Sequence, residues 1–534
     1  MSARLRIPTL VLLLAAAACS RQDAATGLPA LTVDLLLTGG QVYDGSGAAP
    51  VFADVGIRGD RIVFIGDGSR PGLSAQETLD ASGLWIAPGF IDAHSHAELD
   101  RDYGRDGLPF LYQGITSVVL GLDGDGDYEV AATLDRWADS GIGVNGLLFV
   151  GHGAVREAVM GLENRAPDEA EMETMRALVR KGMDEGAFGL STGLFYVPGS
   201  YASTEEIIEL ARIAAGYEGA IYDTHDRDLG AVHEGVGYDA SVREGIRIAR
   251  ESGLRAIFSH YNLQGAHNYG RGDAAAKYIN DARAQGIDVW AAQHPYDATQ
   301  SNLRSYTIPD WAAAGGQEAM RQRFDDPATS AEILAATRAM LDIRGGAERI
   351  VFADPRPELN GKTLADVARE RELEPAAAVQ SLLRDGNASV MNRELYDHAN
   401  TRRLAQESWM MTCTDGRTPQ PDQPITHPRA YGAFPMKMRL FVFDEPLLRP
   451  EFVIRSFSGL AADFYRLPDR GYLREGYAAD VAIIDPTIYR DRATYEEPRR
   501  FATGAVHVLV NGEFAIRDGR ATGVLAGKPL RRPE

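Results

Sequence analysis

The chain has 534 residues, of which 45% are hydrophobic and 24% are charged, a globular composition with room for a large catalytic domain and a smaller satellite. Its formal net charge of −20 argues against a nucleic-acid partner, because phosphate binding needs a basic face. Cys19 and Cys413 are its two cysteines, so a disulfide scaffold is excluded.

The first predicted element is an export signal. Residues 1–18 combine Arg4 and Arg6 with an apolar stretch that is too short to span a bilayer comfortably. Small alanines then precede Cys19, and the whole resembles a bacterial lipoprotein signal with its lipobox. The resemblance implies cleavage before Cys19 and acylation of that cysteine, and Ser20 after it favours the periplasmic face of the outer membrane. The lipid would be the only membrane contact; an ordinary secretory signal is the alternative.

Short apolar runs with turn signals mark both ends of the remaining chain. Residues 19–31 are small and polar and predict a tether, and 32–87 contain runs such as LLLTGG and VGIRGDRIVFIGDG that are typical of strands and hairpins. The same texture returns over 469–534, where Asn511-Gly512 is a strong hairpin signal. Two strand-rich ends around a long middle predict that the ends meet in one small β domain.

Residues 88–468 alternate strand-like and helix-like stretches. Strand candidates include WIAPGFIDAH, GITSVVLG, EGAIYDTH, LRAIFSH and SWMMTCTDG, with amphipathic helix-like stretches between them. Repeated strand–helix units imply a parallel α/β sheet with right-handed crossovers. Their number, and the polar residues at strand ends, predict a TIM-like (β/α)8 barrel. Residues 310–375 do not follow the alternation and indicate an insertion.

Candidate metal ligands end four of these strands. His94 and His96 follow the strand IAPGFID, and because alternate strand residues share a face, both imidazoles should point into the barrel mouth. His225, His260 and Asp415 end three further strands. A single strand-terminal histidine is more often hydrogen-bonded and inert, but the joint pattern predicts a site for a borderline metal such as zinc.

Several longer motifs point to a family. PGFIDAHSHAE, GHGAVR, EGAFGLSTGLFYVPGSYAS, THDRD, HPRAYG and GYAADVAIIDP follow one another between about residue 35 and the C-terminus. With these motifs the sequence resembles the amidohydrolase superfamily, and within it the N-acyl-D-amino-acid deacylase (D-aminoacylase) family. The resemblance implies a TIM-like barrel with a small β-sandwich made from both chain ends. It also implies zinc-dependent hydrolysis of a non-peptide amide in a small N-acyl amino acid or a related amide.

The resemblance also implies roles for individual residues. His225 and His260 match the ligands of a tightly bound Zn²⁺, and His94 and His96 match a second, weaker or variable metal position. Whether one metal or two is bound is left open. Asp415 matches the catalytic aspartate, which would accept the water proton as general base and deliver it to the leaving nitrogen. Its carboxylate is also a candidate metal ligand.

Two positions depart from the family pattern. Relatives typically carry a cysteine zinc ligand in a GNCG segment, and here the segment is GLDG, with Asp123 in that place. A carboxylate is a competent, harder ligand, so we predict that Asp123 holds the metal; the alternative is an ordinary loop residue in the acidic run DGDGD. Where the family commonly has a lysine for the substrate carboxylate stands Asn262. Its position makes Asn262 a candidate substrate contact, although its neutral amide cannot supply that charge–charge interaction.

Three further residues are candidate substrate contacts. Tyr196 in GLFYVPG and Tyr296 in HPY match positions near the substrate in the family, although tyrosines there can equally be packing residues. Arg304 could supply the cation that is missing at Asn262. Arg429 in HPRAYG is interpreted as structural, as is the histidine of GHGAVR, His152.

The substitution at Asn262 leaves other substrates open: a dipeptide, a cyclic amide, or an acyl amide without a free carboxylate. D versus L selectivity and the oligomeric state are left open as well. A hypothesis from another class is a lipoprotein that binds a metal or a solute without turnover. Asp415 after the last barrel strand argues against it, because a pure binder needs no proton carrier there.

Overall fold

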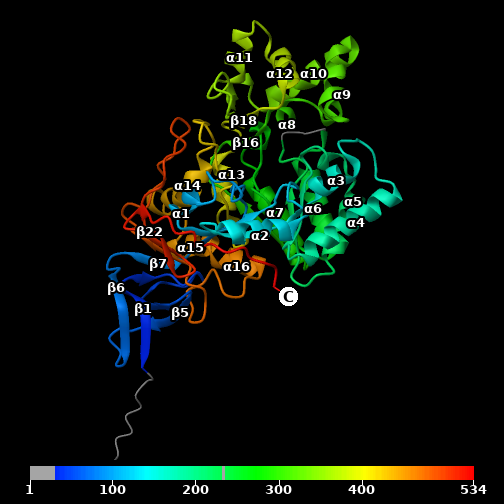
Figure 1. Ribbon diagram of the computed structural model, residues 1–534. Coiled ribbons are helices and arrows are strands. Elements are labelled where there is room, and N and C mark those ends of the chain that lie inside the picture. Colours follow the sequence, from blue (N-terminus) through cyan, green and yellow to red (C-terminus); the bar gives the residue numbers. More distant parts are fainter. Residues whose placement is uncertain (1–29, 231–234, 534) are drawn as a thin grey trace, which may run out of the picture.

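The computed structural model describes residues 30–230 and 235–533 (Figure 1). The export signal at 1–18, the acylation site Cys19 and most of the predicted tether lie outside the described residues. Within the described part of the chain, no helix combines the length and the apolar character that crossing a membrane requires.

Strands from both chain ends form a β-sandwich beside the barrel, where the blue and red ends of the chain meet in Figure 1. One sheet has the order β5-β4-β1-β6 and consists of β1 (Leu31–Thr38), β4 (Asp54–Arg58), β5 (Arg61–Gly66) and β6 (Leu73–Asp80). The other has the order β23-β22-β21-β20-β7-β2-β3 and consists of β2 (Gln41–Val42), β3 (Val51–Phe52), β7 (Trp85–Pro88), β20 (Val481–Ile484), β21 (Ala505–Val510), β22 (Glu513–Arg517) and β23 (Arg520–Ala521).

The second sheet of the sandwich contains strands from both ends of the chain. β20 pairs antiparallel with β7, so the strand that leads into the barrel is hydrogen-bonded to a strand that comes after the whole barrel in the sequence. The predicted hairpin at Asn511-Gly512 is confirmed, because these residues connect paired Val510 and Glu513. Both turn residues have positive φ, 49° and 87°, as a two-residue turn that follows the strand twist requires.

Eight parallel strands of the described residues form the barrel, which confirms the predicted fold class. They are β8 (Phe90–Asp92), β9 (Ile115–Leu120), β10 (Asn145–Leu148), β12 (Gly189–Gly193), β13 (Ile221–His225), β14 (Arg255–Phe258), β15 (Val289–Gln293) and β19 (Met410–Thr412). The short β11 (Val150–Gly151) continues β10 and pairs with β12. The barrel closes between its first and last strands, where Ala93 N donates to Thr412 O at 3.4 Å.

Helices follow the strands around the outside of the barrel. They include α1 (Leu108–Leu111), α2 (Val130–Ser140), α3 (His152–Met160), α4 (Glu169–Asp184), α5 (Thr204–Ala214), α6 (Tyr238–Ser252), α7 (Gly272–Ala284), α13 (His398–Leu404), α14 (Arg429–Met438), α15 (Pro450–Phe457) and α16 (Gly459–Tyr465). The helix α4 illustrates how the local sequence forms these helices. Asp168 and Glu171 cap each other's backbone N–H in a capping box at its start. Met175 and Val179, one turn apart, are buried in the barrel core.

The chain leaves the barrel between β15 and β19 and builds an insertion, which lies over one end of the barrel at the top of Figure 1. Its antiparallel sheet has the order β16-β18-β17 and consists of β16 (Thr299–Asn302), β17 (Ile350–Phe352) and β18 (Ser389–Asn392). Its helices are α8 (Leu303–Thr307), α9 (Gly316–Asp325), α10 (Pro327–Ile343), α11 (Leu364–Glu370) and α12 (Pro375–Asp385).

The insertion reaches beyond the 310–375 segment on both sides. It has a hydrophobic core of its own, with Leu303, Ile333, Phe352 and Val379 in one buried cluster. Its first strand is the polar TQSN, which carries no apolar strand pattern, and the start of the insertion at β16 was therefore not predicted from the sequence.

Candidate active site

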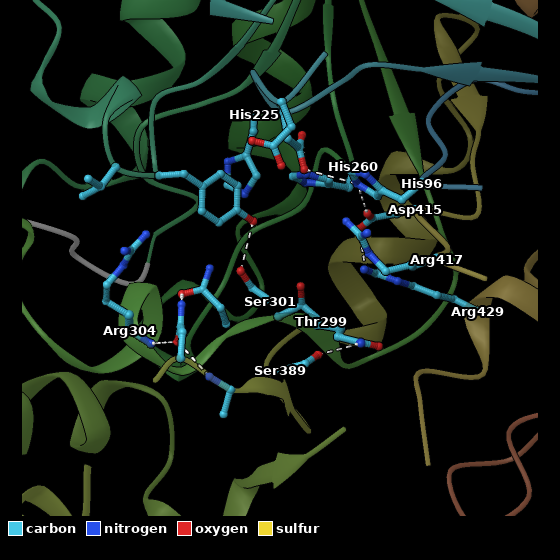
Figure 2. Close-up of a pocket in the computed structure, with 18 residues that line it drawn as sticks. His96, His225, His260, Thr299, Ser301, Arg304, Ser389, Asp415, Arg417 and Arg429 are labelled. Carbon is cyan, nitrogen blue, oxygen red and sulfur yellow. Dashed lines mark hydrogen bonds and ion pairs between the residues drawn. The ribbon is translucent and has the colours of Figure 1, made fainter. Parts of the chain in front are cut away.

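The predicted metal ligands converge at one end of the barrel. His94 and His96 follow β8, His225 is the last residue of β13, and Asp123, His260 and Asp415 lie just beyond β9, β14 and β19. Figure 2 shows His96, His225, His260 and Asp415 around one side of the same cavity. The carboxyl ends of parallel barrel strands meet at one face, so strands that are distant in sequence place their last side chains together.

Asp123 lies at the centre of this cluster. Its Oδ1 is 3.5 Å from His94 Nε2 and 3.7 Å from His260 Nε2, and its Oδ2 is 3.4 Å from His96 Nε2. Asp415 Oδ1 is 3.7 Å from His94 Nε2 and 3.4 Å from His96 Nε2. One donor atom each of His94, Asp123, His260 and Asp415 lies within 4.8 Å of the other three.

This donor set fits a metal ion. Asp123 Oδ1 is buried and accepts no hydrogen bond from the described residues, a costly state for a carboxylate oxygen unless a cation satisfies it. His94 Nε2 and His96 Nε2 face each other at 3.3 Å, so two imidazole nitrogens converge on one point. Imidazole nitrogens and carboxylate oxygens are ligands that zinc accepts.

His225 stands beside the four-residue cluster. Its Nδ1–H donates to the backbone carbonyl of Asp226 at 3.0 Å, which leaves Nε2 as the unprotonated nitrogen. Its ring centroid is 4.5 Å from that of His260. Burial, together with the neighbouring charge of His260, lowers the pKa of His225 to about 4, so its imidazole is neutral at pH 7.

Three of the converging residues have unusual backbones. Asp123, His260 and Asp415 have φ values of 57°, 34° and 50°, in the left-handed region that residues with a side chain rarely adopt. Such conformations cost free energy that the surrounding structure must offset, and they concentrate at functional sites. Each occurs just after a strand ends, where the chain turns and the simple alternation of strand side chains stops.

Electrostatics keep the two carboxylates charged. Burial alone would raise the pKa of Asp123, but the His94 charge and the close contacts of the surrounding imidazoles hold that pKa well below its usual range. Burial likewise opposes ionisation of Asp415, and the guanidinium of Arg429 outweighs it and lowers the pKa of that carboxyl. Burial lowers the pKa of His96, but hydrogen bonds with both carboxylates raise it to about 9.

Arg429 has a role that the sequence analysis missed. Its Nη1 donates to Asp415 Oδ2 in a buried ion pair, and the side chain lines the cavity. The structural interpretation of Arg429 therefore has to include a contact with the candidate catalytic residue. The contact joins the first residue of α14 to the loop after β19. In the sequence, the only indication of this contact is that the motif HPRAYG follows closely after TDG. His152, in contrast, is buried against Glu206 at 3.0 Å and does not line the cavity.

The floor of a cavity of about 460 Å³ is formed by His96, Asp123, His225, His260 and Asp415, whereas the fully buried His94 does not line it. The insertion lines the opposite side, which is the lower side in Figure 2. The insertion lines it with polar groups: Thr299, Gln300, Ser301, Asn302, Arg304, Asn387 and Ser389. Tyr196 also lines it, with its hydroxyl accepting from Ser301 Oγ at 3.2 Å and its ring against His225. Asp125 and Arg417 line it as well, and neither was singled out from the sequence.

Asn262 and Tyr296 do not line this cavity, which corrects their prediction as substrate contacts. The Nδ2 of buried Asn262 donates to Thr401 Oγ1 at 2.9 Å, because the chain turns at His260 and carries the following side chains away. The ring of Tyr296 packs edge-on against His427, with centroids 5.2 Å apart. Both side chains are therefore occupied by packing and hydrogen bonds within the protein.

A model of the amidohydrolase family matches residues 77–516. The protein belongs to the amidohydrolase family. It is 34% identical over 531 residues to a D-aminoacylase of Alcaligenes xylosoxydans xylosoxydans, covering 93% of this chain and 98% of the relative. It is also 34% identical over 514 residues to an N-acyl-D-aspartate deacylase of the same organism, covering 92% and 93%.

A solved structure of similar shape is the N-acyl-D-glutamate deacylase of Bordetella bronchiseptica, crystallised with zinc and a phosphonate that mimics the tetrahedral intermediate. The two share 29% identity with a TM-score of 0.78, over 94% of this amidohydrolase and 100% of the other chain. These similarities extend over the barrel, the sandwich and the insertion together. They confirm the predicted family, and with it the amidohydrolase class of enzyme.

Proposed function

We propose that this amidohydrolase removes the acyl group from N-acyl-D-amino acids with the help of zinc. The observation that carries the proposal is the buried Asp123 Oδ1, which accepts no hydrogen bond from the described residues and lies among converging imidazoles beside the cavity. Near-complete coverage of a D-aminoacylase and of an N-acyl-D-aspartate deacylase supports the choice of substrate.

The residues on the floor suit one tightly bound zinc and an optional second metal. Asp123, His225 and His260 form one group of donors, His94 and His96 form the other, and the two oxygens of Asp123 face both groups. Zinc bound there would acidify water and polarise the amide carbonyl. A zinc-containing relative with a phosphonate mimic of the tetrahedral intermediate supports this assignment.

Asp415 suits the role of proton carrier. Arg429 holds its Oδ2, which fixes the carboxylate and keeps it deprotonated, while Oδ1 faces His96 across 3.4 Å. A deprotonated carboxylate on the cavity floor can accept a proton from the attacking water and pass it to the leaving nitrogen. This assigns Asp415 as general base and then general acid.

Arg304 suits the substrate carboxylate. It lines the cavity on the side opposite Asp415 in Figure 2, and none of the described carboxylates forms an ion pair with it. Its Nε is buried and has no hydrogen-bond partner among the described residues. A guanidinium in this state can bind an incoming carboxylate, which Asn262 cannot do from its position outside the cavity.

The deciding experiment compares purified protein on paired N-acyl-D- and N-acyl-L-amino acids, with zinc measured by elemental analysis on the same sample. We expect turnover of the D substrates, loss of activity on chelation, and recovery with added zinc. Hydrolysis restricted to a dipeptide, a cyclic amide or an amide without a carboxylate would replace the substrate assignment. A zinc-bound protein without any amidase activity would overturn the proposed function.

We also propose that the chain is exported and anchored through an acylated Cys19, as the sequence of residues 1–18 indicates. Labelled palmitate fed to a Gram-negative host should enter the full-length protein and fail to enter the Cys19→Ser variant. Equal labelling of the two proteins, or none in either, would contradict the anchor.

A further inference from the structure

A buried carboxylate beneath the metal site has no part in the mechanism above. Asp223 lies in the middle of β13, fully buried and two residues before His225. Its Oδ2 accepts a hydrogen bond from Ser191 Oγ at 2.6 Å, and its Oδ1 accepts one from Ser259 Oγ at 2.6 Å. No described residue forms an ion pair with it, and these two hydroxyl groups supply the hydrogen bonds that a costly buried carboxylate needs.

Each of the two hydroxyl groups connects Asp223 to a segment that carries a proposed metal ligand. Ser191 Oγ also accepts from the backbone N–H of Gly124, the residue after Asp123, at 3.3 Å. Ser259 is the residue directly before His260. One carboxylate therefore connects, through a single hydroxyl on either side, the backbones that carry two of the proposed ligands.

The segments that carry Asp123 and His260 have backbone conformations that the rest of the structure must stabilise. Asp123 and His260 have left-handed backbones, with φ of 57° and 34°, that an unconstrained chain would leave. Asp123 Oδ1 accepts no hydrogen bond from the described residues that would fix its position. The hydrogen bonds through Ser191 and Ser259 act on the backbone next to each of these residues and so restrain both turns.

We propose that Asp223 is a positioning residue: through Ser191 and Ser259 it holds Asp123 and His260 in the geometry that receives the metal. This inference rests on the metal site of the proposed function and adds a group that does not itself touch the metal. Removing partners that orient metal ligands typically weakens metal binding by about 10–100-fold. We therefore expect zinc affinity, rather than overall folding, to be the property that this network controls.

The test measures the zinc Kd by competition with a chelator at fixed pH, and the melting temperature of the metal-free protein, for Ser191→Ala, Ser259→Ala and Asp223→Asn. We expect each serine variant to raise the Kd about 10–100-fold. Thr192→Val is the matched control: Thr192 is the next residue of β12 and equally buried, and its hydroxyl contacts Tyr222, Thr224 and the backbone carbonyl of Asp223 but not the Asp223 carboxylate. Its Kd should stay within about twofold of wild type.

A thermodynamic cycle sharpens the test. If both serines act through Asp223, the Kd increase caused by Ser191→Ala should shrink in the Asp223→Asn background. The serine variants keep the test valid should Asp223→Asn fail to fold. Lower melting temperatures with an unchanged Kd would overturn the inference, because they would show a merely structural network. A wild-type protein that binds zinc but hydrolyses no amide would overturn the proposed function and leave this inference standing.

Discussion

Replacing Asp123 tests the centre of the site. Its two oxygens face His94, His96 and His260 at 3.4–3.7 Å, so one substitution removes the group that all three imidazoles share. Zinc binding at structural sites with four ligands contributes roughly 10–16 kcal/mol, or about 2.5–4 kcal/mol per ligand. Asp123→Ala should therefore weaken zinc binding by about 10²–10³-fold.

Two matched variants separate charge from shape. Asp123→Asn keeps the size of the side chain and removes its charge, so it should lose most of the same affinity. Asp123→Cys supplies a thiolate, which zinc accepts, so it should keep zinc and bind it in preference to harder metals.

The assay is elemental analysis after dialysis against a chelator of known zinc affinity, followed by kcat and KM at saturating zinc. Asp123→Ala should retain less than one tenth of the wild-type zinc, and its melting temperature without metal should change little. Wild-type stoichiometry and Kd in Asp123→Ala would refute the assignment, and Asp123 would then be an ordinary loop residue.

Three further predictions concern Asp415, Arg304 and the buried Lys437 of α14, whose Nζ donates to Thr412 Oγ1 at 2.7 Å. Asp415→Asn should keep the fold and the zinc but lower kcat by about 10²–10⁴-fold; near-wild-type turnover would remove it as proton carrier. Arg304→Gln should lower kcat/KM by about 10–100-fold for an N-acyl-D-amino acid and leave the corresponding amide, which lacks the carboxylate, unaffected. Equal losses on both substrates would contradict the carboxylate contact. Burial lowers the pKa of Lys437 from 10.5 to about 7, so between these values the unfolded chain binds a proton that the folded chain does not. The wild type should therefore gain stability relative to Lys437→Met as the pH rises from 7 to 10, by up to about 1.4 kcal/mol per unit in denaturant unfolding; a parallel pH dependence of the two proteins would refute this.

Strand periodicity carried much of the prediction of the site. His94 and His96 share a face because they are two residues apart, and the parallel barrel places His225, His260 and Asp415 at the same end. These rules are local or depend only on the fold class, so they work without coordinates. They stop at the strand ends, where Asp123, His260 and Asp415 adopt left-handed backbones.

For residues that follow these turns, the sequence predicted the positions of the side chains less accurately. Asn262 follows the turn at His260 and is carried into a packed position against Thr401, out of reach of the cavity. Arg429 was interpreted as structural because nothing local links it to Asp415, fourteen positions earlier. The polar wall from the insertion was missed because the strand TQSN has no apolar pattern.

The sequence by itself determined the class of fold, the family and the cluster of His and Asp side chains, because hydrophobic periodicity and strand-end motifs are local patterns of neighbouring residues. Only the tertiary structure decided which side chains line the cavity, that Arg429 pairs with Asp415, and that Asp223 connects the segments of Asp123 and His260. Those contacts join distant strands and loops, and their hydrogen bonds depend on angles and distances that no spacing in the sequence records.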